Sequence, residues 1–225
     1  MDIQNSFFLF KLLEMKKLMV LILFFSFCSV VSSQNLAVCA DKNNVLYIGV
    51  DNPISVVAEN YPSRQLMAKA EKGTLIGSNG RIFIYRGIEP GNESIIVYNK
   101  ENSKEIGRSS FRVKYIPDPI PKVGSSASGN IQGIVLKKQQ FLRAELENFD
   151  FSVVFEIDSF TLNIIRTDTC FFKELINVGS KFGSAVTEAL NNIRKNDIVI
   201  FKKIYVLGPD GRSRVLSPLV LTITD

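Results

Sequence analysis

Acidic side chains are the first candidates for chemistry in this sequence. Glu145, Glu147 and Asp150 lie close together along the chain. Two carboxylates can cleave a glycoside when they face each other across a gap of about 5–10 Å. Here they flank an apolar segment at a spacing typical of solvated positions. The sequence therefore favours solvated carboxylates over a catalytic pair.

The residues needed for nucleophilic or metal chemistry are scarce. The chain contains no histidine and three cysteines, which excludes Ser–His and Cys–His pairs and removes the commonest metal ligand. Cys28 lies in an apolar leader, so Cys39 and Cys170 are the thiols of the exported part. They could pair in an oxidising compartment, but two separate thiols are favoured because they fall in different predicted domains. We expect no enzyme activity and no catalytic, cofactor-binding or metal residue.

A glycine-rich turn is the remaining motif. The segment 208–211 reads Gly-Pro-Asp-Gly, without the lysine and helix of a phosphate-binding loop or the acidic ladder of a calcium loop. It therefore predicts a hairpin turn. Basic residues on both sides could form a patch across the hairpin, or the lysines among them could be outward-facing strand residues that discourage edge pairing. These residues are Lys202, Lys203, Arg212 and Arg214.

Charge and composition exclude several classes of partner. The formal charge is +5 and 46% of residues are hydrophobic. Removing residues 1–33 takes away three lysines and two acids, which leaves +4. Because Lys and Arg are scattered among acids, no nucleic-acid binding is expected, and no small-molecule substrate is indicated. Asn92-Glu93-Ser94 matches the N-glycosylation pattern, which matters only in a eukaryotic secretory pathway.

The first 33 residues have the pattern of a secretory signal peptide. Lys16 and Lys17 precede an apolar run over 18–31, which ends in Val-Ser-Ser; this run is shorter than the roughly 20 residues of a membrane span. We expect cleavage between Ser33 and Gln34 and export from the cytoplasm. An uncleaved anchor is an alternative, and a lipoprotein at Cys28 is disfavoured by its large neighbour. Residues 1–14 could precede the true start, at position 15.

Proline and glycine divide the exported part into two domains. Prolines at 117, 119 and 121 are followed by a Gly/Ser-rich stretch over 124–129, and such composition is typical of a stiff connector leading into a flexible one. The expected organisation is a first domain over 41–117, a linker over 118–129 and a second domain over 130–225.

Short strands with turns between them dominate the first domain. Alternation in Phe111, Val113 and Tyr115 places these three side chains on one face. Turns are expected at 51–53 and 78–80. Such a series of short strands predicts an immunoglobulin-like β-sandwich. The expected strands are 45–50, 54–58, 66–70, 81–85, 94–98 and 110–115.

The second domain is expected to be α+β, with one short helix. Apolar residues at every second position predict a long strand with one buried face, and a bulge near Asp158-Ser159 would explain a slip in its phase. Ser184 is a plausible N-cap of the helix. Strands are expected at 198–206 and 215–224. The alternating residues are Phe149, Phe151, Val153, Phe155 and Ile157.

Three ordered stretches of the chain resemble the periplasmic part of the GldM family, gliding-motility and type IX secretion proteins of Bacteroidota. The stretches are 45–53 (VLYIGVDNP), 111–119 (FRVKYIPDP), and a terminal series that runs from Asn148-Phe149-Asp150-Phe151 to Leu216-Ser217-Pro218. The resemblance covers about 43–225. The resemblance does not extend to the family's transmembrane helix and large helical domain.

The resemblance implies a non-enzymatic interaction module in the periplasm. Its expected partners are envelope proteins, either an outer-membrane lipoprotein ring or a full-length GldM-type protein, and a homodimer is a further option. Docking would use strand edges and loop surfaces. The alternative is a secreted or surface adhesion or scaffold protein that reuses the same β domains.

Overall fold

The computed structural model describes residues 36–40, 44–77, 81–166, 168 and 171–225. The expected signal peptide with its Ser33–Gln34 cleavage site, the expected turn at 78–80 and Cys170 therefore lie outside the described residues. Among the residues that are described, no helix is long and apolar enough to cross a membrane.

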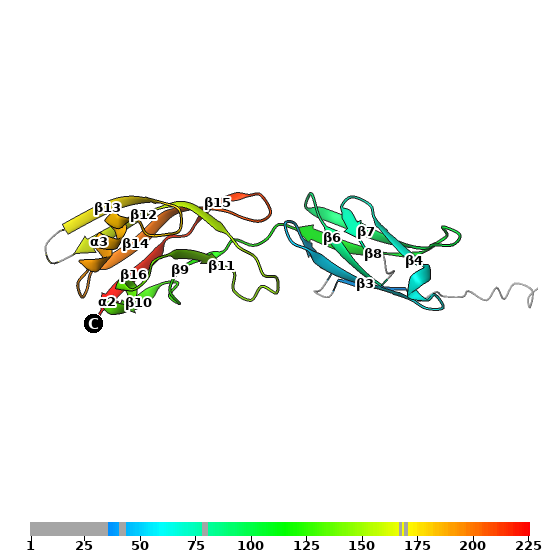
Figure 1. Cartoon of the computed structure of the whole chain (residues 1–225), viewed down its shortest axis with the longest axis horizontal. Helices are drawn as coiled ribbons and strands as arrows, with labels where there is room; N and C mark the ends of the chain where they lie inside the picture. The colour runs from blue at the N-terminus through cyan, green and yellow to red at the C-terminus, as the bar shows by residue number, and fades with distance from the viewer. Residues whose placement is uncertain (1–35, 41–43, 78–80, 167, 169–170) are drawn as a thin grey trace, which may run out of the picture. The chain divides into compact units, whose positions relative to one another are not determined.

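The first domain is an immunoglobulin-like sandwich of two antiparallel-rich, four-stranded sheets (Figure 1). One sheet has the order β1-β3-β6-β5 and the other β2-β8-β7-β4. Their inner faces share one apolar core that includes Leu46, Ile54, Tyr85, Ile95 and Phe111. The strands are β1 (Leu36–Ala40), β2 (Val45–Tyr47), β3 (Asn52–Ala58), β4 (Leu66–Ala70), β5 (Thr74–Ile76), β6 (Ile82–Arg86), β7 (Gly91–Asn99) and β8 (Glu105–Lys114), with a 3-10 turn η1 (Ser63–Gln65) before β4.

Two details of this domain differ from the sequence prediction. The expected turn at 51–53 is wrong, because β3 begins at Asn52. The buried amide of Asn52 accepts a hydrogen bond from Tyr47 N (2.8 Å) and donates to the carbonyls of Tyr47 and Tyr85, so its side chain makes the turn's bonds while its backbone is already in the sheet. Tyr115 lies beyond the end of β8 and is exposed, whereas Phe111 and Val113 are buried as predicted.

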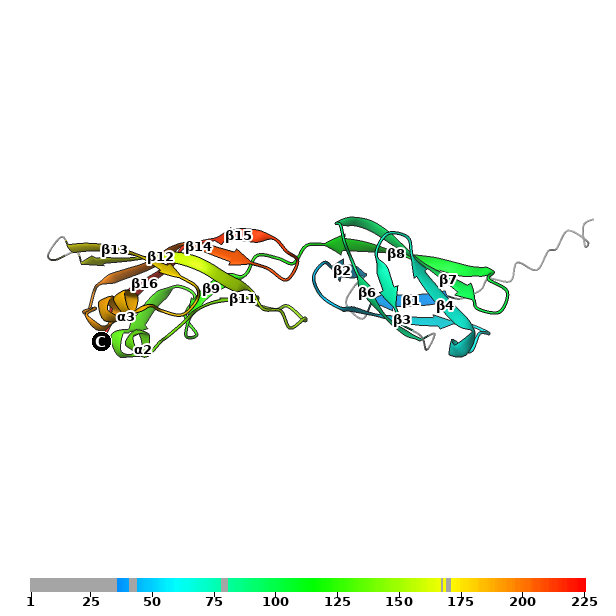
Figure 2. The ribbon, with the colours of Figure 1, turned by 45° about the horizontal axis from the view of Figure 1, so that its top comes forward.

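The second domain is an α+β unit built on a six-stranded sheet. The sheet has the order β10-β16-β14-β12-β13, and β15 also pairs with β14. Figure 2 shows the helices α2 and α3 and the β9–β11 ribbon on one side of this sheet. The elements are β9 (Ile120–Val123), β10 (Gly129–Gln132), α2 (Gly133–Lys137), β11 (Leu142–Glu145), β12 (Glu156–Arg166), β13 (Phe171–Val178), α3 (Ser184–Asn191), β14 (Ile198–Leu207), β15 (Ser213–Leu216) and β16 (Leu219–Thr224).

The core of the second domain fills the space between the sheet and its cover. Phe160, Phe182 and Phe201 contact one another with ring centroids 5.6–5.9 Å apart. Helix α3 contributes Val186, Ala189 and Leu190. Its N-cap is Gly183, so the predicted cap, Ser184, is instead the first residue of the helix. The short helix α2 was not expected.

The segment expected as a linker enters the fold of the second domain. β9 pairs with β11 from Ile120 opposite Glu145 to Val123 opposite Leu142. Ile116 and Val123 are buried in the second core, and Pro119 is buried as well. These residues are therefore part of the packed structure and not a spacer.

The alternating apolar segment at 149–157 behaves as predicted only in part. Phe155 and Ile157 are buried and their predecessors Phe149 and Phe151 are half-buried, but β12 begins only at Glu156. The predicted bulge is confirmed, since the register of β12 against β14 shifts on both sides of Ser159. The preceding residues keep their alternation without a paired strand beside them.

Candidate interaction surface

Two of the three acidic residues singled out in the sequence, Glu145 and Glu147, form ion pairs at the surface. Lys122 Nζ lies 3.6 Å from Glu145 and 2.9 Å from Glu147, and both carboxylates are more than one-third exposed. This matches the expectation of solvated carboxylates. Among the described residues, no group of three His, Cys, Asp or Glu side chains could hold a metal ion. Cys39 is a free, exposed thiol.

The predicted hairpin turn is confirmed, with a buried ion pair at its base. Gly211 N donates to Gly208 O (3.0 Å), and β14 pairs with β15 across the turn. Arg214 Nη2 lies 2.5 Å from Asp210 Oδ2, and Arg214 Nε lies 2.8 Å from Asp118 Oδ1. Burial alone would raise the pKa of Asp210, but the hydrogen bonds and charge of Arg214 lower it below its ordinary value.

The two interpretations of the basic residues near this hairpin are both wrong. Arg214 is 4% exposed and fully engaged, so it adds nothing to a surface patch. Lys202 pairs with Glu174 at 2.8 Å. The strand that carries Lys202, β14, has neighbours on both sides, so its lysines protect no edge. Arg212 lies over the ring of Tyr115, 4.4 Å from its centroid.

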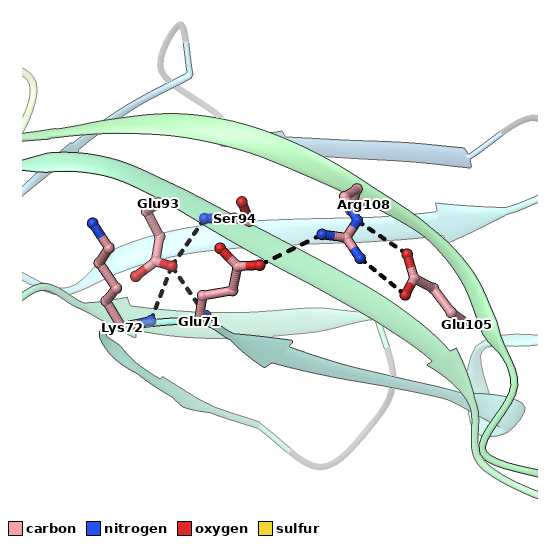
Figure 3. Close-up of polar contacts among 6 residues, drawn as sticks. All are labelled: Glu71, Lys72, Glu93, Ser94, Glu105 and Arg108. Carbon is pink, nitrogen blue, oxygen red and sulfur yellow. Dashed lines mark hydrogen bonds and ion pairs between the residues drawn. The ribbon is translucent and has the colours of Figure 1, made fainter.

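A buried carboxylate organises the first domain. Glu93 is 1% exposed, and its Oε1 accepts hydrogen bonds from the backbone N–H groups of Glu71, Lys72 and Ser94 at 2.9–3.2 Å. Figure 3 shows these three bonds, with the Arg108–Glu105 ion pair on the neighbouring strand. Oε2 accepts from Gly73 N and the Tyr85 hydroxyl, both at 2.7 Å. The carboxylate thus fastens the β4–β5 turn to β7.

Titration of this pair follows from its surroundings. Burial would raise the pKa of Glu93, but donors from Gly73, Tyr85 and Lys72 lower it below its ordinary value. Burial, together with the nearby Glu93 carboxylate, raises the pKa of Tyr85. The sequence analysis treated Glu93 only as the middle of a glycosylation pattern. Its alternation with the buried Ile95 and Val97 was the signal that places it inside.

The outer face of the six-stranded sheet carries apolar side chains around a polar centre. Glu174 on β13 lies opposite Asn163 on β12, and Lys202 on β14 lies opposite Thr161, two residues before Asn163. When the amide oxygen and nitrogen of Asn163 are exchanged, the amide nitrogen donates to Glu174 Oε2 (3.0 Å) and the amide oxygen accepts from Lys202 Nζ (2.9 Å). Exposed apolar side chains surround this centre on the same sheet: Phe172, Ile176, Val178, Tyr205, Val215 and Val220.

β13 forms one edge of that sheet (Figure 1). Its side chains alternate between the outer face, with Phe172 and Ile176, and the helix-covered face, with Phe171 and Leu175. Arg166 lies over the ring of Phe171, 5.1 Å from its centroid. The edge strand is therefore apolar on both of its faces.

Asn177 is the last residue but one of the edge strand β13. Its buried Nδ2 donates to the carbonyls of Val178, Gly179 and Lys181 at 2.9–3.1 Å, and its Oδ1 accepts from Gly183 N at 2.8 Å. One side chain therefore shapes the whole loop from β13 to α3.

We expect Asn177→Ala to lower the free energy of unfolding by about 2 kcal/mol, because it leaves buried backbone groups without partners. Thermal or chemical denaturation followed by circular dichroism measures this loss. Asn192→Ala is the matched control, since its exposed amide makes one bond, to Glu188 O. Equal, small losses in both variants would contradict the role given to Asn177.

The two domains each match a known family. Residues 35–114 match the GldM third domain, and residues 117–224 match the GldM C-terminal domain. The chain belongs to the GldM family. The resemblance stated from the sequence is confirmed, and the boundary between the two matches falls at the proline-rich segment. GldM C-terminal domains are periplasmic and serve as non-enzymatic structural modules of gliding and type IX secretion.

Other comparisons add little to this GldM-family assignment. No curated protein matches the chain. Among solved structures, the Yersinia pseudotuberculosis adhesin InvE is 9% identical over 85% of this chain and 59% of its own, with a TM-score of 0.29. Surface layer protein SbsC, domains 6–7, is 10% identical over 87% and 100%, with a TM-score of 0.31. Tandem Ig repeats of Dlar are 10% identical over 85% and 98%, at 0.25. These similarities carry no functional argument.

Proposed function

We propose that this GldM-family chain is an exported, non-enzymatic docking module that binds envelope components of a type IX secretion or gliding apparatus. The observation that carries the proposal is the succession of two family domains, third and C-terminal, over residues 35–224. The unpartnered outer face and the open edge of the second domain supply surface for such docking, since apolar strand edges bind other chains through backbone bonds and alternate side chains.

The location of the module is part of this proposal. The signal-like segment over 1–33 supports export to the periplasm, where the partners would be an outer-membrane lipoprotein ring or a full-length GldM-type protein. The chain could bind them as a monomer or as a homodimer. The Ser33–Gln34 cleavage is tested by the N-terminal sequence of the protein recovered from cells.

Crosslinked capture from the cell envelope tests the proposed function. The tagged protein is expressed in its own cells, crosslinked and isolated, and the captured proteins are identified by mass spectrometry. We expect secretion or gliding components in the periplasmic fraction. Recovery of the folded bait from the cell surface or medium, without those components, would contradict the proposal and favour an adhesion or scaffold role.

A further inference from the structure

We propose that β13 is a docking edge that accepts an extended strand from a different protein, in which an acidic side chain stands between apolar ones. The inference rests on the proposed function and deepens it, because it assigns the docking surface and the chemistry of the partner segment. Three features of β13 support it: a poorly protected edge, apolar side chains on both faces and one unmatched charge.

The edge of β13 lacks most of the usual protection. It has eight residues, twice the four of β10, the strand at the other end of the sheet. Its pairing with β12 runs from Val178 to Phe171 without a register shift, and it contains no proline. Within the described part of the chain, no backbone hydrogen bond from a segment other than β12 reaches residues 171–176. Natural edges are normally blunted by short length, bulges, proline, covering segments or charged side chains, and of these devices β13 has only the charges of Lys173 and Glu174.

Side chains on both faces of β13 suit an added strand. On the outer face Phe172 is 58% exposed and Ile176 is 78% exposed. On the other face Phe171 is exposed and Leu175 packs against the edge of the core. A strand paired with β13 would extend both layers, and alternate apolar side chains on it would cover these four residues.

The charge of Lys173 specifies the partner further. Two other basic residues near this edge are matched, because Arg166 pairs with Asp197 at 3.0 Å and Lys202 pairs with Glu174. No ion pair or hydrogen bond of the Lys173 side chain occurs among the described residues. Lys173 stands between Phe171 and Leu175 on one face, so an acidic residue opposite it on the added strand would complete the edge.

A second copy of this chain fits the edge poorly. When two copies of β13 pair antiparallel about a twofold axis, residues of one face can lie opposite only residues of the same face. This restriction leaves two long registers. One long register places Glu174 opposite Glu174. The other places Lys173 opposite Asn177, whose amide is already fully bonded. Both leave charges repelled or unmatched, so the edge favours a different protein.

A charge-swap experiment with two synthetic peptides tests the proposal. Each peptide has about ten residues of alternating valine and threonine, with either glutamate or lysine at the centre. Binding to the full exported chain is measured by fluorescence anisotropy, and hydrogen exchange locates the bound peptide. We expect the wild type to bind the glutamate peptide about fivefold more tightly and to show new protection at β13.

Two variants decide whether Lys173 is responsible. Lys173→Glu should reverse the preference, whereas Lys114→Glu, the same change at an exposed lysine of β8, should keep it. A preference that Lys173→Glu does not reverse, protection at another strand, or binding of neither peptide would overturn the proposal.

Envelope capture separates this inference from the function on which it rests. Ile176→Lys places a charge on the edge, and Val154→Lys does the same at a residue of equal exposure (78%) outside the sheet. We expect Ile176→Lys alone to lose the captured secretion components, while both variants keep the wild-type melting temperature. Equal capture by both would refute the docking edge but leave the proposed function intact. Absence of those components with the wild type would refute the proposed function.

Discussion

Replacing Arg214 with methionine should lower the free energy of unfolding of the second domain by about 3–5 kcal/mol. Methionine keeps much of the apolar stem but removes the guanidinium. Asp210, whose side chain is fully buried, would then be an uncompensated charge, and Ile116 O would lose its donor (3.1 Å). Hydrogen exchange with mass spectrometry measures the loss domain by domain.

Asp118→Ala is the control for this prediction. It removes the other carboxylate that contacts Arg214, but Asp118 is 74% exposed, so its loss should cost less than about 1 kcal/mol. If Arg214→Met proved as mild as Asp118→Ala, the buried pair would not be what holds the hairpin to the chain near residue 116. A large loss confined to the first domain would also contradict the assignment.

Replacing Glu93 with leucine should lower the free energy of unfolding of the first domain by about 3–5 kcal/mol. The substitution leaves the backbone N–H groups of Lys72, Gly73 and Ser94 and the Tyr85 hydroxyl without their acceptor, while Glu71 N keeps its bond to Ser94 O. Unmet buried donors are costly. Glu71→Leu is the matched control, because that carboxylate is 42% exposed and makes one long ion pair with Arg108. Its side chain takes no part in the Glu93 network.

Acid should reduce the contribution of Glu93. Its pKa is lower in the folded protein than its ordinary value of 4.5, so the ionised carboxylate stabilises the fold fully above about pH 4.5. This stabilisation is lost as the pH falls through the lower, folded value, where the carboxylate is protonated. The difference in unfolding free energy between wild type and Glu93→Gln should therefore shrink below pH 4.5. A difference that grows on acidification would contradict the assignment.

Local patterns in the sequence determined much of this protein. Alternation of apolar residues located most strands of the first domain and the strands β12 and β14 of the second, and the slip in that alternation located the bulge at Ser159. The Gly-Pro-Asp-Gly segment specified its hairpin because proline and glycine restrict or free the backbone regardless of what surrounds them. The ordered stretches of residues also sufficed to indicate the GldM family.

Only the tertiary structure decided which strand is an edge and which partners allow charged residues to be buried. Asp210 and Arg214 resemble surface residues in the sequence, because the cost of burying a charge depends on partners that can be distant in the chain, such as Asp118. The proline-rich segment reads as a spacer until Ile116 and Val123 meet the second core. The edge position of β13 follows from strand order, which alternation does not encode.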